Sequence, residues 1–204
     1  MPAPAKLFLA SSNAGKLREY SALAEKFSSP QSLEIAALPG FDALPPFSEN
    51  APTFAENAAG KALHYSRLTH EAVFADDSGL VVPALRGAPG VHSARYAGEH
   101  ASNAERIAKL LVEMRGKTGR EREAHFVCVI ALARAGKVLA VVTDRVEGEL
   151  LEVPRGSQGF GYDPVFFFPS LGKTFAELSP QEKNLHSHRG KAFRKLLAYV
   201  VEAF

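Results

Sequence analysis

The chain has 204 residues, of which 46% are hydrophobic, enough to bury one sizeable core or two joined lobes. Its formal net charge of +2 at pH 7 argues against a dedicated nucleic-acid-binding protein, and its one cysteine, Cys128, excludes an intramolecular disulfide. The N-terminal apolar run is too short for a signal peptide, and no stretch reaches the length of a membrane span. We therefore expect a soluble, cytoplasmic protein.

The first half of the chain alternates short apolar runs with segments whose apolar residues recur every three or four positions. This pattern predicts strands alternating with helices. A turn at Asp77–Gly79 is predicted to end the third strand, because Asp-Ser-Gly is common in turns. In chain order the predicted elements are a strand at 6–10, a helix at 15–27 with a buried face of Leu17, Tyr20, Ala24 and Phe27, a strand at 33–37, a loop at 39–52, a helix at 53–68, a strand at 72–75 and extended chain at 80–82.

Capping and turn signals organise the second half. Ser102 and Glu105 form an S-x-x-E capping box that opens a helix ending at Gly116, and a second box begins at Ser179. The pattern predicts an α/β fold with a mixed central β-sheet flanked by helices, as one domain over residues 1–204 with two lobes around a cleft. The remaining predicted elements are an antiparallel hairpin of 124–134 and 137–144 turning at Ala135-Gly136, a strand at 165–168 and a closing helix at 193–201.

Residues 11–16, SSNAGK, lie between the first predicted strand and the first predicted helix. Backbone N–H groups at a helix N-terminus suit phosphate, and Lys16 would add a positive charge. The loop is not a Walker A motif, because Ala10 stands where that motif has its first glycine and Leu17 where it has Ser or Thr. An ordinary helix cap with an exposed lysine explains the stretch equally well.

Asp76 and Asp77 follow the third predicted strand, and the acidic loop that contains Glu49 precedes them in the chain. Magnesium prefers oxygen ligands and usually takes one or two carboxylates together with substrate phosphate oxygens. Carboxylates at the carboxyl end of a strand lie where α/β proteins bind ligands, and one carboxylate could deprotonate a water for attack on phosphorus. A solvated Asp-Ser-Gly turn is the alternative.

A glycine-rich stretch at 156–166, GSQGFGYDPVF, could approach a ligand closely and offers Phe160 and Tyr162 as stacking rings. Its spacing does not match the dinucleotide-binding fingerprint. The alternative is a turn whose aromatic residues fill the core.

A basic stretch at 182–190, EKNLHSHRG, places Lys183, His188 and Arg189 before the last predicted helix. Such donors can bind phosphate or the edge of a base. Taken by itself, the stretch is better explained as a solvated basic loop.

Together these stretches supply phosphate donors, carboxylates, aromatic rings and further cations, which indicates a nucleoside triphosphate site. In order, the motifs SSNAGKLRE, TFAENAAGKA, ADDSGLVVPALRGAPGVHSARYAG, GFGYDPVFF and EKNLHSHRGKA resemble the non-canonical purine nucleoside triphosphate pyrophosphatases nearly end to end. The resemblance implies hydrolysis of ITP, dITP and XTP to the monophosphate and pyrophosphate, with Mg²⁺ as cofactor. It also implies a cytoplasmic homodimer that keeps deaminated purines out of DNA and RNA.

The resemblance further implies roles for single residues. Asp77 matches the general base and metal ligand, and Glu49 is the best match for a second metal ligand. Family members often have two adjacent acidic residues there, where this chain has Ser48-Glu49. The implied substrate-binding positions are Ser11, Ser12, Asn13, Ala14, Gly15, Lys16, Lys61, Ser78, Phe160, Gly161, Tyr162, Asp163, Lys183, His188 and Arg189.

Two other functions compete with this one. A related pyrophosphatase could act on modified pyrimidine or 7-methylated guanine nucleotides, although the SHRG and FGYD stretches argue against it. A nucleotide-sensing or nucleic-acid-binding module without turnover is the second, and the balanced charge and the carboxylates speak against polyanion binding.

Overall fold

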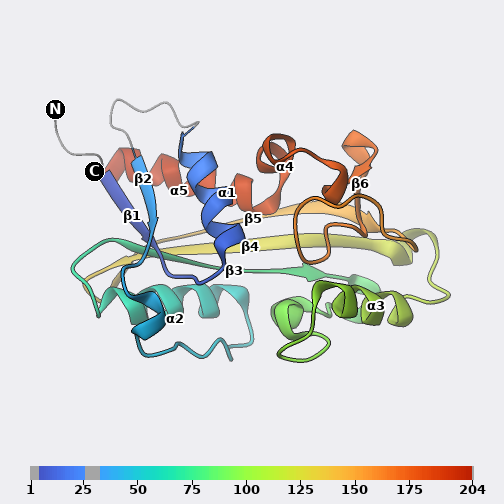
Figure 1. The fold of residues 1–204 in the computed structure, drawn as a ribbon, viewed down its shortest axis with the longest axis horizontal. Coiled ribbons are helices and arrows are strands. Elements are labelled where there is room, and N and C mark those ends of the chain that lie inside the picture. The colour runs from blue at the N-terminus through green and yellow to red at the C-terminus, as the bar shows by residue number, and fades with distance from the viewer. Residues whose placement is uncertain (1–4, 26–32, 204) are drawn as a thin grey trace. The chain divides into compact units, whose positions relative to one another are not determined.

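The computed structural model describes residues 5–25 and 33–203. In this part of the chain the strands form one mixed sheet in the order β2-β1-β3-β4-β5-β6-β7, with helices beside it (Figure 1). The α/β class, the mixed sheet and the long hairpin are thereby confirmed. The strands are β1 (Ala5–Leu9), β2 (Leu33–Ala37), β3 (Val73–Val81), β4 (Glu123–Arg134), β5 (Lys137–Leu150), β6 (Phe166–Phe168) and β7 (Lys173–Thr174), and the α-helices are α1 (Ala14–Glu25), α2 (Phe54–Ser66), α3 (Asn103–Glu113), α4 (Pro180–His186) and α5 (His188–Ala203).

The chain divides into two compact units, each built from separate segments. Unit 1 consists of Met1–Asp77, Cys128–Asp144 and Arg189–Phe204, and unit 2 of Ser78–Val127 and Arg145–His188. The single domain with two lobes around a cleft stays a prediction.

Unit 1 contains the parallel part of the sheet. β1 pairs in parallel with β2 on one side and with β3 on the other. Helices α1 and α5 lie over one face of these strands and α2 over the opposite face (Figure 1). Tyr20 of α1, Phe74 of β3 and Phe193 of α5 pack with ring centroids 4.8–5.8 Å apart, which anchors both helices to the sheet. Phe27, expected on the same helical face as Tyr20, lies outside the described residues.

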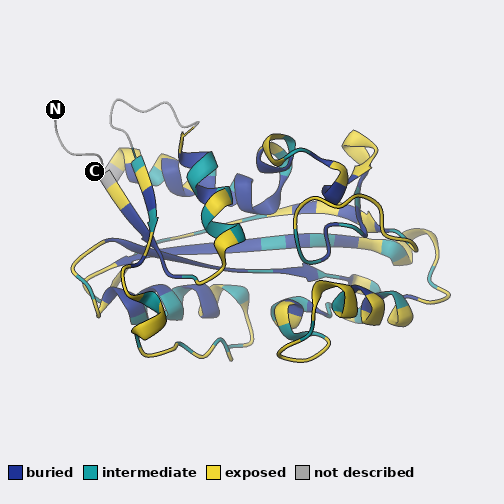
Figure 2. Cartoon of the chain, viewed as in Figure 1, coloured by how far each residue is buried: buried dark blue, intermediate teal, exposed yellow. Residues whose placement is uncertain are grey.

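The turn predicted at Asp77–Gly79 is wrong, because β3 continues through it from Val73 to Val81. β3 lies between β1 and β4 in the sheet, so its backbone groups find partners on both sides. Most of its side chains are buried as well (Figure 2). Ladder hydrogen bonds and burial outweigh the local turn preference of Asp-Ser-Gly.

Unit 2 confirms both predicted capping boxes. The hydroxyl of Ser102 accepts a hydrogen bond from the backbone of Glu105 at the start of α3, and Ser179 does the same at the start of α4. The core of this unit gathers the rings of Phe126, Phe166 and Phe175, with centroid distances of 4.5–5.9 Å. No helix in the described part of the chain combines the length and apolar character that crossing a bilayer requires.

The last helix begins at His188, earlier than the predicted start at Phe193. The basic stretch before Phe193 is therefore helical and largely buried, and the solvated loop considered for it is excluded: Lys183, His188 and Arg189 are all at most 5% exposed. Carboxylate and aromatic neighbours allow this burial of cationic groups, as described below.

Candidate active site

The SSNAGK loop connects β1 to α1 in unit 1. The side chain of Asn13 caps the helix: its Oδ1 accepts hydrogen bonds from the backbone N–H groups of Gly15 at 2.9 Å and Lys16 at 3.1 Å. Ser11 Oγ accepts another from the backbone of Asn13 at 3.2 Å. The helix cap considered from sequence is thus present, but its lysine is not exposed, because the Lys16 side chain is only 16% accessible.

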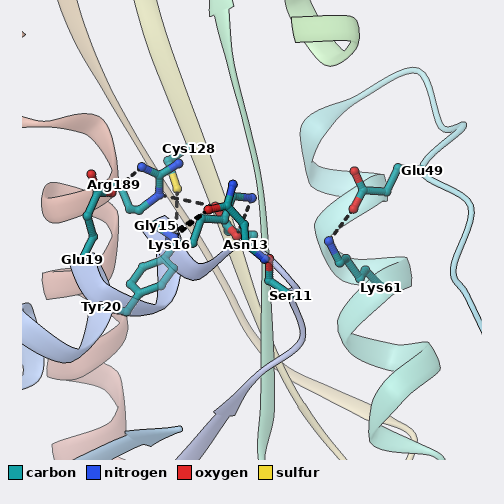
Figure 3. A network of polar contacts seen from close by, with 11 residues as sticks. Ser11, Asn13, Gly15, Lys16, Glu19, Tyr20, Glu49, Lys61, Cys128 and Arg189 are labelled. Atoms are coloured by element: carbon teal, nitrogen blue, oxygen red, sulfur yellow. Dashed lines mark hydrogen bonds and ion pairs between the residues drawn. The ribbon is translucent and has the colours of Figure 1, made fainter. Parts of the chain in front are cut away.

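Lys16 belongs to a ring of four charges that joins α1, β3 and α5 (Figure 3), of which Asp76 and Arg189 are buried and Lys16 and Glu19 partly exposed. Its ammonium lies 2.9 Å from Asp76 Oδ1, and Arg189 Nε lies 3.6 Å from Asp76 Oδ2. Arg189 Nη1 in turn lies 2.5 Å from Glu19 Oε2, which returns the ring to α1. Burial raises the pKa of Asp76, but Lys16 and Arg189 outweigh burial and hold that pKa well below its usual range. Asp76 therefore carries a full negative charge.

Asp77 has different surroundings, because consecutive side chains of a strand point to opposite faces of the sheet. Its Oδ2 accepts a hydrogen bond of 3.0 Å from Asn57 on α2. Burial, and then the negative charges of Glu49 and Asp76, raise the pKa of Asp77 to about 6, although Asn57 and Lys16 lower it. A carboxylate with a raised pKa beside cations is typical of a catalytic base.

Glu49 pairs with Lys61 of α2, in a contact that lies on the other side of β3 from Lys16 in Figure 3. Because Glu49 raises the pKa of Asp77, the two carboxylates lie within electrostatic range of one another. Two carboxylates are a donor set that suits Mg²⁺, which completes its coordination with water and phosphate oxygens. Among the described residues, no group of three or more His, Cys, Asp or Glu gathers around a common point. The residues therefore fit a metal shared with a substrate better than a metal held by protein alone.

In unit 2 the FGYD stretch folds around one carboxylate. Asp163 Oδ2 accepts hydrogen bonds from the backbone N–H of Phe160 at 2.8 Å and from Lys183 Nζ at 2.7 Å. The Lys183 ammonium also lies 4.6 Å from the centroid of the Phe160 ring. His188 stacks on Phe126, with ring centroids 4.7 Å apart and an angle of 13° between the planes. Phe160, Asp163 and Lys183 are thus brought together.

Tyr162 fills the core of unit 2, as the alternative for its stretch proposed. Its hydroxyl donates a hydrogen bond of 2.9 Å to the carbonyl of Ser93. Ser78 follows Asp77 in β3 and belongs to unit 2. The predicted site residues are thus divided between the two units. Unit 1 contains Ser11–Lys16, Glu49, Lys61, Asp77 and Arg189, and unit 2 contains Ser78, Phe160–Asp163, Lys183 and His188.

Three partners of the candidate residues were given no role by the resemblance: Glu19, Asn57 and Asp76. All three carry a signal in the sequence. Glu19 stands three residues after Lys16 and Asn57 four residues before Lys61, the spacings that place side chains on one helical face. For Asp76 the signal was its position beside Asp77.

A cavity of about 420 Å³ lies beside the loop, between the ends of β1 and β2. Its walls include Ser11–Ala14, Phe41 and Asp42, together with apolar side chains. Lys16, Lys61 and Asp77 do not line it. Among the described residues that line this cavity, the one charged side chain is the carboxylate of Asp42. The cavity therefore does not suit a triphosphate, and the cations of unit 1 remain the better candidates for that role.

The fold agrees with comparisons to known proteins. The model of the Ham1 family matches residues 7–199. The chain belongs to the Ham1 family. Among its relatives, the "dITP/XTP pyrophosphatase" of Geobacillus kaustophilus is 51% identical over 191 residues, which cover 94% of this chain and 92% of the relative. A protein of the same name from Thermosynechococcus vestitus is 48% identical, over 98% of this chain and 97% of its own length.

Solved structures of Ham1 proteins share this fold. A HAM1 protein from Coxiella burnetii superposes with a TM-score of 0.86 at 42% identity, over 98% of this chain and all of the other. The Ham1 protein of Staphylococcus aureus gives a TM-score of 0.83 at 36% identity, over 96% and 97% of the two chains. The resemblance found in the motifs is therefore confirmed.

Proposed function

We propose that this protein hydrolyses dITP, XTP and ITP to the nucleoside monophosphate and pyrophosphate, which removes deaminated purine nucleotides before they enter DNA or RNA. The names of its relatives support this substrate class. The observation that carries the proposal is the setting of Asp77. It is a buried carboxylate held by Asn57, within electrostatic range of Lys16 and of the second carboxylate, Glu49.

The cations of unit 1 would bind the triphosphate. A nucleoside triphosphate carries about four negative charges at neutral pH, so its binding requires local positive charge on a protein that is nearly neutral. Lys16, at the start of α1, and Lys61, on α2, would supply it, with the hydroxyl groups of Ser11 and Ser12 as further donors. Glu49 and Asp77 would hold Mg²⁺, which neutralises phosphate charge and acidifies water when bound.

Asp77 would act as the general base. Its carboxylate would orient a water for in-line attack at the α-phosphorus and accept the proton of that water. The hydrogen bond from Asn57 to Oδ2 fixes the direction of the carboxylate. The leaving pyrophosphate would gain charge as the bond breaks, and the two lysines would stabilise that charge.

Recognition of the base is proposed for Phe160–Asp163, Lys183, His188 and Arg189. Hypoxanthine and xanthine have a 6-keto oxygen where adenine has an amino group, so a buried donor facing that oxygen would be left unpaired with ATP. Phe160 offers a ring for stacking, and the charged side chains offer donors. Because Asp163 already accepts from Phe160 and Lys183, we infer that it shapes this stretch. We also propose a cytoplasmic homodimer, as the resemblance implies.

The test is pyrophosphate release from dITP, XTP, ITP, GTP and ATP by the purified protein, with and without Mg²⁺. We expect release from the first three, at rates at least about 100-fold above ATP, and only with a divalent cation. A modified pyrimidine nucleotide and 7-methyl-GTP belong in the same panel. Turnover of these alone would favour the related pyrophosphatase, and nucleotide binding without any release would favour a sensing module.

A further inference from the structure

Asp76 has no substrate-binding or catalytic role in the proposal above. It is nevertheless the residue that links the two cations of the charge ring formed by Lys16, Asp76, Arg189 and Glu19. Its carboxylate contacts two cations that come from different helices, Lys16 of α1 and Arg189 of α5. The side chain of Asp76 is 0% exposed, whereas that of Lys16 retains 16% of its accessible surface. A ligand in solvent can therefore reach the lysine and cannot reach the aspartate.

We propose that Asp76 is a positioning residue that holds the ammonium group of Lys16 in place for the triphosphate. A free lysine side chain has many rotamers, and ordering it costs free energy at the moment of binding. An ion pair of 2.9 Å to a buried carboxylate removes that cost in advance. The inference rests on the proposed function, because it takes the triphosphate as the ligand of Lys16.

The other charges of the ring hold the Asp76 side chain itself in place. Asp76 is part of β3, and Arg189 pairs with its second oxygen. Glu19 fixes Arg189 from α1, three residues after Lys16 on the same helix. Positive and negative charges alternate around the ring, so the four charges compensate one another where water is scarce. Moving Asp76 would disturb the rest of the ring.

The same geometry separates the work of the two neighbouring aspartates. Asp77 points toward Asn57 and is proposed to act on the reacting water, whereas Asp76 acts only through Lys16. The two residues should therefore differ in which kinetic constant they control. Loss of Asp77 should lower kcat, and loss of Asp76 should raise KM.

A double-mutant cycle tests whether Asp76 acts through Lys16. We expect Asp76→Asn to raise the KM for dITP at least about tenfold while kcat changes less than about threefold. Lys16→Met should raise KM to a similar degree, and the double variant should be no worse than Lys16→Met within about twofold. An equal effect of Asp76→Asn in both backgrounds would overturn the proposal. A lower KM for Asp76→Asn would also overturn the proposal, because it would show that the carboxylate weakens phosphate binding by neutralising the charge of Lys16.

Binding measurements separate this idea from the proposed function. Tripolyphosphate has no base, so titration calorimetry with it reports on the phosphate-binding cations alone. We expect Asp76→Asn to weaken its binding at least about fivefold in the Lys16 protein and less than about twofold in the Lys16→Met protein. If the wild-type protein bound tripolyphosphate with this coupling but released no pyrophosphate from any nucleotide, the proposed reaction would fail and the positioning role would stand.

Two further variants serve as a substitute for Asp76→Asn and as a control. Asp76→Asn leaves buried cations with less compensation, so its thermal midpoint must be measured. If it does not fold, Glu19→Gln loosens the ring from its partly exposed end and should raise KM about two- to fivefold, again only when Lys16 is present. Lys195→Met is the matched control, because Lys195 pairs with Asp144 on the surface of unit 1 and should leave KM unchanged.

Discussion

Asp77 accepts its hydrogen bond from an amide group, so the isosteric Asp77→Asn variant changes charge and little of the shape. Removing a general base lowers kcat by about 10²–10⁴. The fold should persist, because a neutral side chain at this buried position relieves the desolvation of the carboxylate. Steady-state pyrophosphate release and thermal unfolding measure the two expectations.

The exposed Asp42→Asn variant is the control for Asp77→Asn, since it removes one carboxylate elsewhere in unit 1. It should retain its kcat. A kcat for Asp77→Asn within about threefold of the wild type would show that another group accepts the proton.

The pair of Lys61 and Glu49 gives a prediction on metal binding. A divalent cation that binds Glu49 must compete with the ammonium group already there. Lys61→Met should therefore bind Mn²⁺ at least about threefold more tightly in the absence of nucleotide, because a positive charge beside the metal ligands is gone. Electron paramagnetic resonance of free Mn²⁺ measures this directly.

The same Lys61→Met variant should bind tripolyphosphate more weakly, since it has lost a phosphate donor. Opposite signs for the two ligands are the distinctive result, and Lys195→Met should change neither. Weaker Mn²⁺ binding by Lys61→Met would contradict the competition.

At the level of single residues, the sequence indicated which groups could matter but not their partners. Lys16 and Arg189 were expected to face substrate, and the structure gives both of them carboxylate partners as well. The Lys16–Asp76 pair spans 60 positions and the Arg189–Glu19 pair spans 170. Periodicity and motifs act over a few residues, so pairings across such distances depend on how the strands and helices assemble.

Helix α2 carries Asn57 and Lys61 toward the candidate site, and its packing against the preceding loop can be tested at Gly60. A Cβ atom at this position would lie 2.7 Å from Cζ of Phe47, which is two residues before Glu49. Gly60→Ala favours the helix by about 0.5–1 kcal/mol but forces the ring, and with it the loop, to move. We expect a midpoint of unfolding close to the wild type and a clear loss of Mn²⁺ affinity.

A compensating change sharpens the test at Gly60. Phe47→Leu removes the far edge of the ring, so the double variant with Gly60→Ala should regain part of the lost affinity. If Gly60→Ala bound Mn²⁺ like the wild type, the position of the loop would not matter to the metal ligands.

Elements with strong local signals were predictable, whereas the continuation of β3 through Ser78 was not. The boxes at Ser102 and Ser179 fix helix starts by hydrogen bonds within four residues, so sequence alone located α3 and α4. The hairpin turn at Ala135-Gly136, where both residues have positive φ, is equally local. The turn expected at Ser78 failed because its outcome depends on the strands on either side of β3.

For the whole molecule, three strands continue from one unit into the other: β3, β4 and β5 each contain residues of both. Backbone hydrogen bonds along a strand resist separate melting of its two ends, so we expect a single cooperative unfolding transition. Gly148 of β5 provides the probe. A Cβ there would lie 2.5 Å from both the Phe166 ring and the Phe167 carbonyl, and such overpacking typically costs about 1–3 kcal/mol.

Gly148→Ala changes a residue of unit 2. It should nevertheless lower the midpoint of the single unfolding transition measured by circular dichroism. It should also reduce the hydrogen-exchange protection of amides in β1 of unit 1, by the same loss of stability. Val141→Ala, at an exposed position of the same strand, should shift the midpoint much less. Two separate transitions, or unchanged protection in β1, would show that the units unfold independently.

Because side chains alternate between the two faces of β3, the face on which each of Asp76 and Asp77 lies depends on whether the number of residues before it in the strand is odd or even. Deleting one residue between Val73 and Asp76 would carry each carboxylate to the side where its neighbour now stands, so that α2 faced the wrong acid and α1 lost its counter-charge. Evolution can exchange many residues of this strand one at a time, but an odd change in its length would have to be repaired within the strand itself.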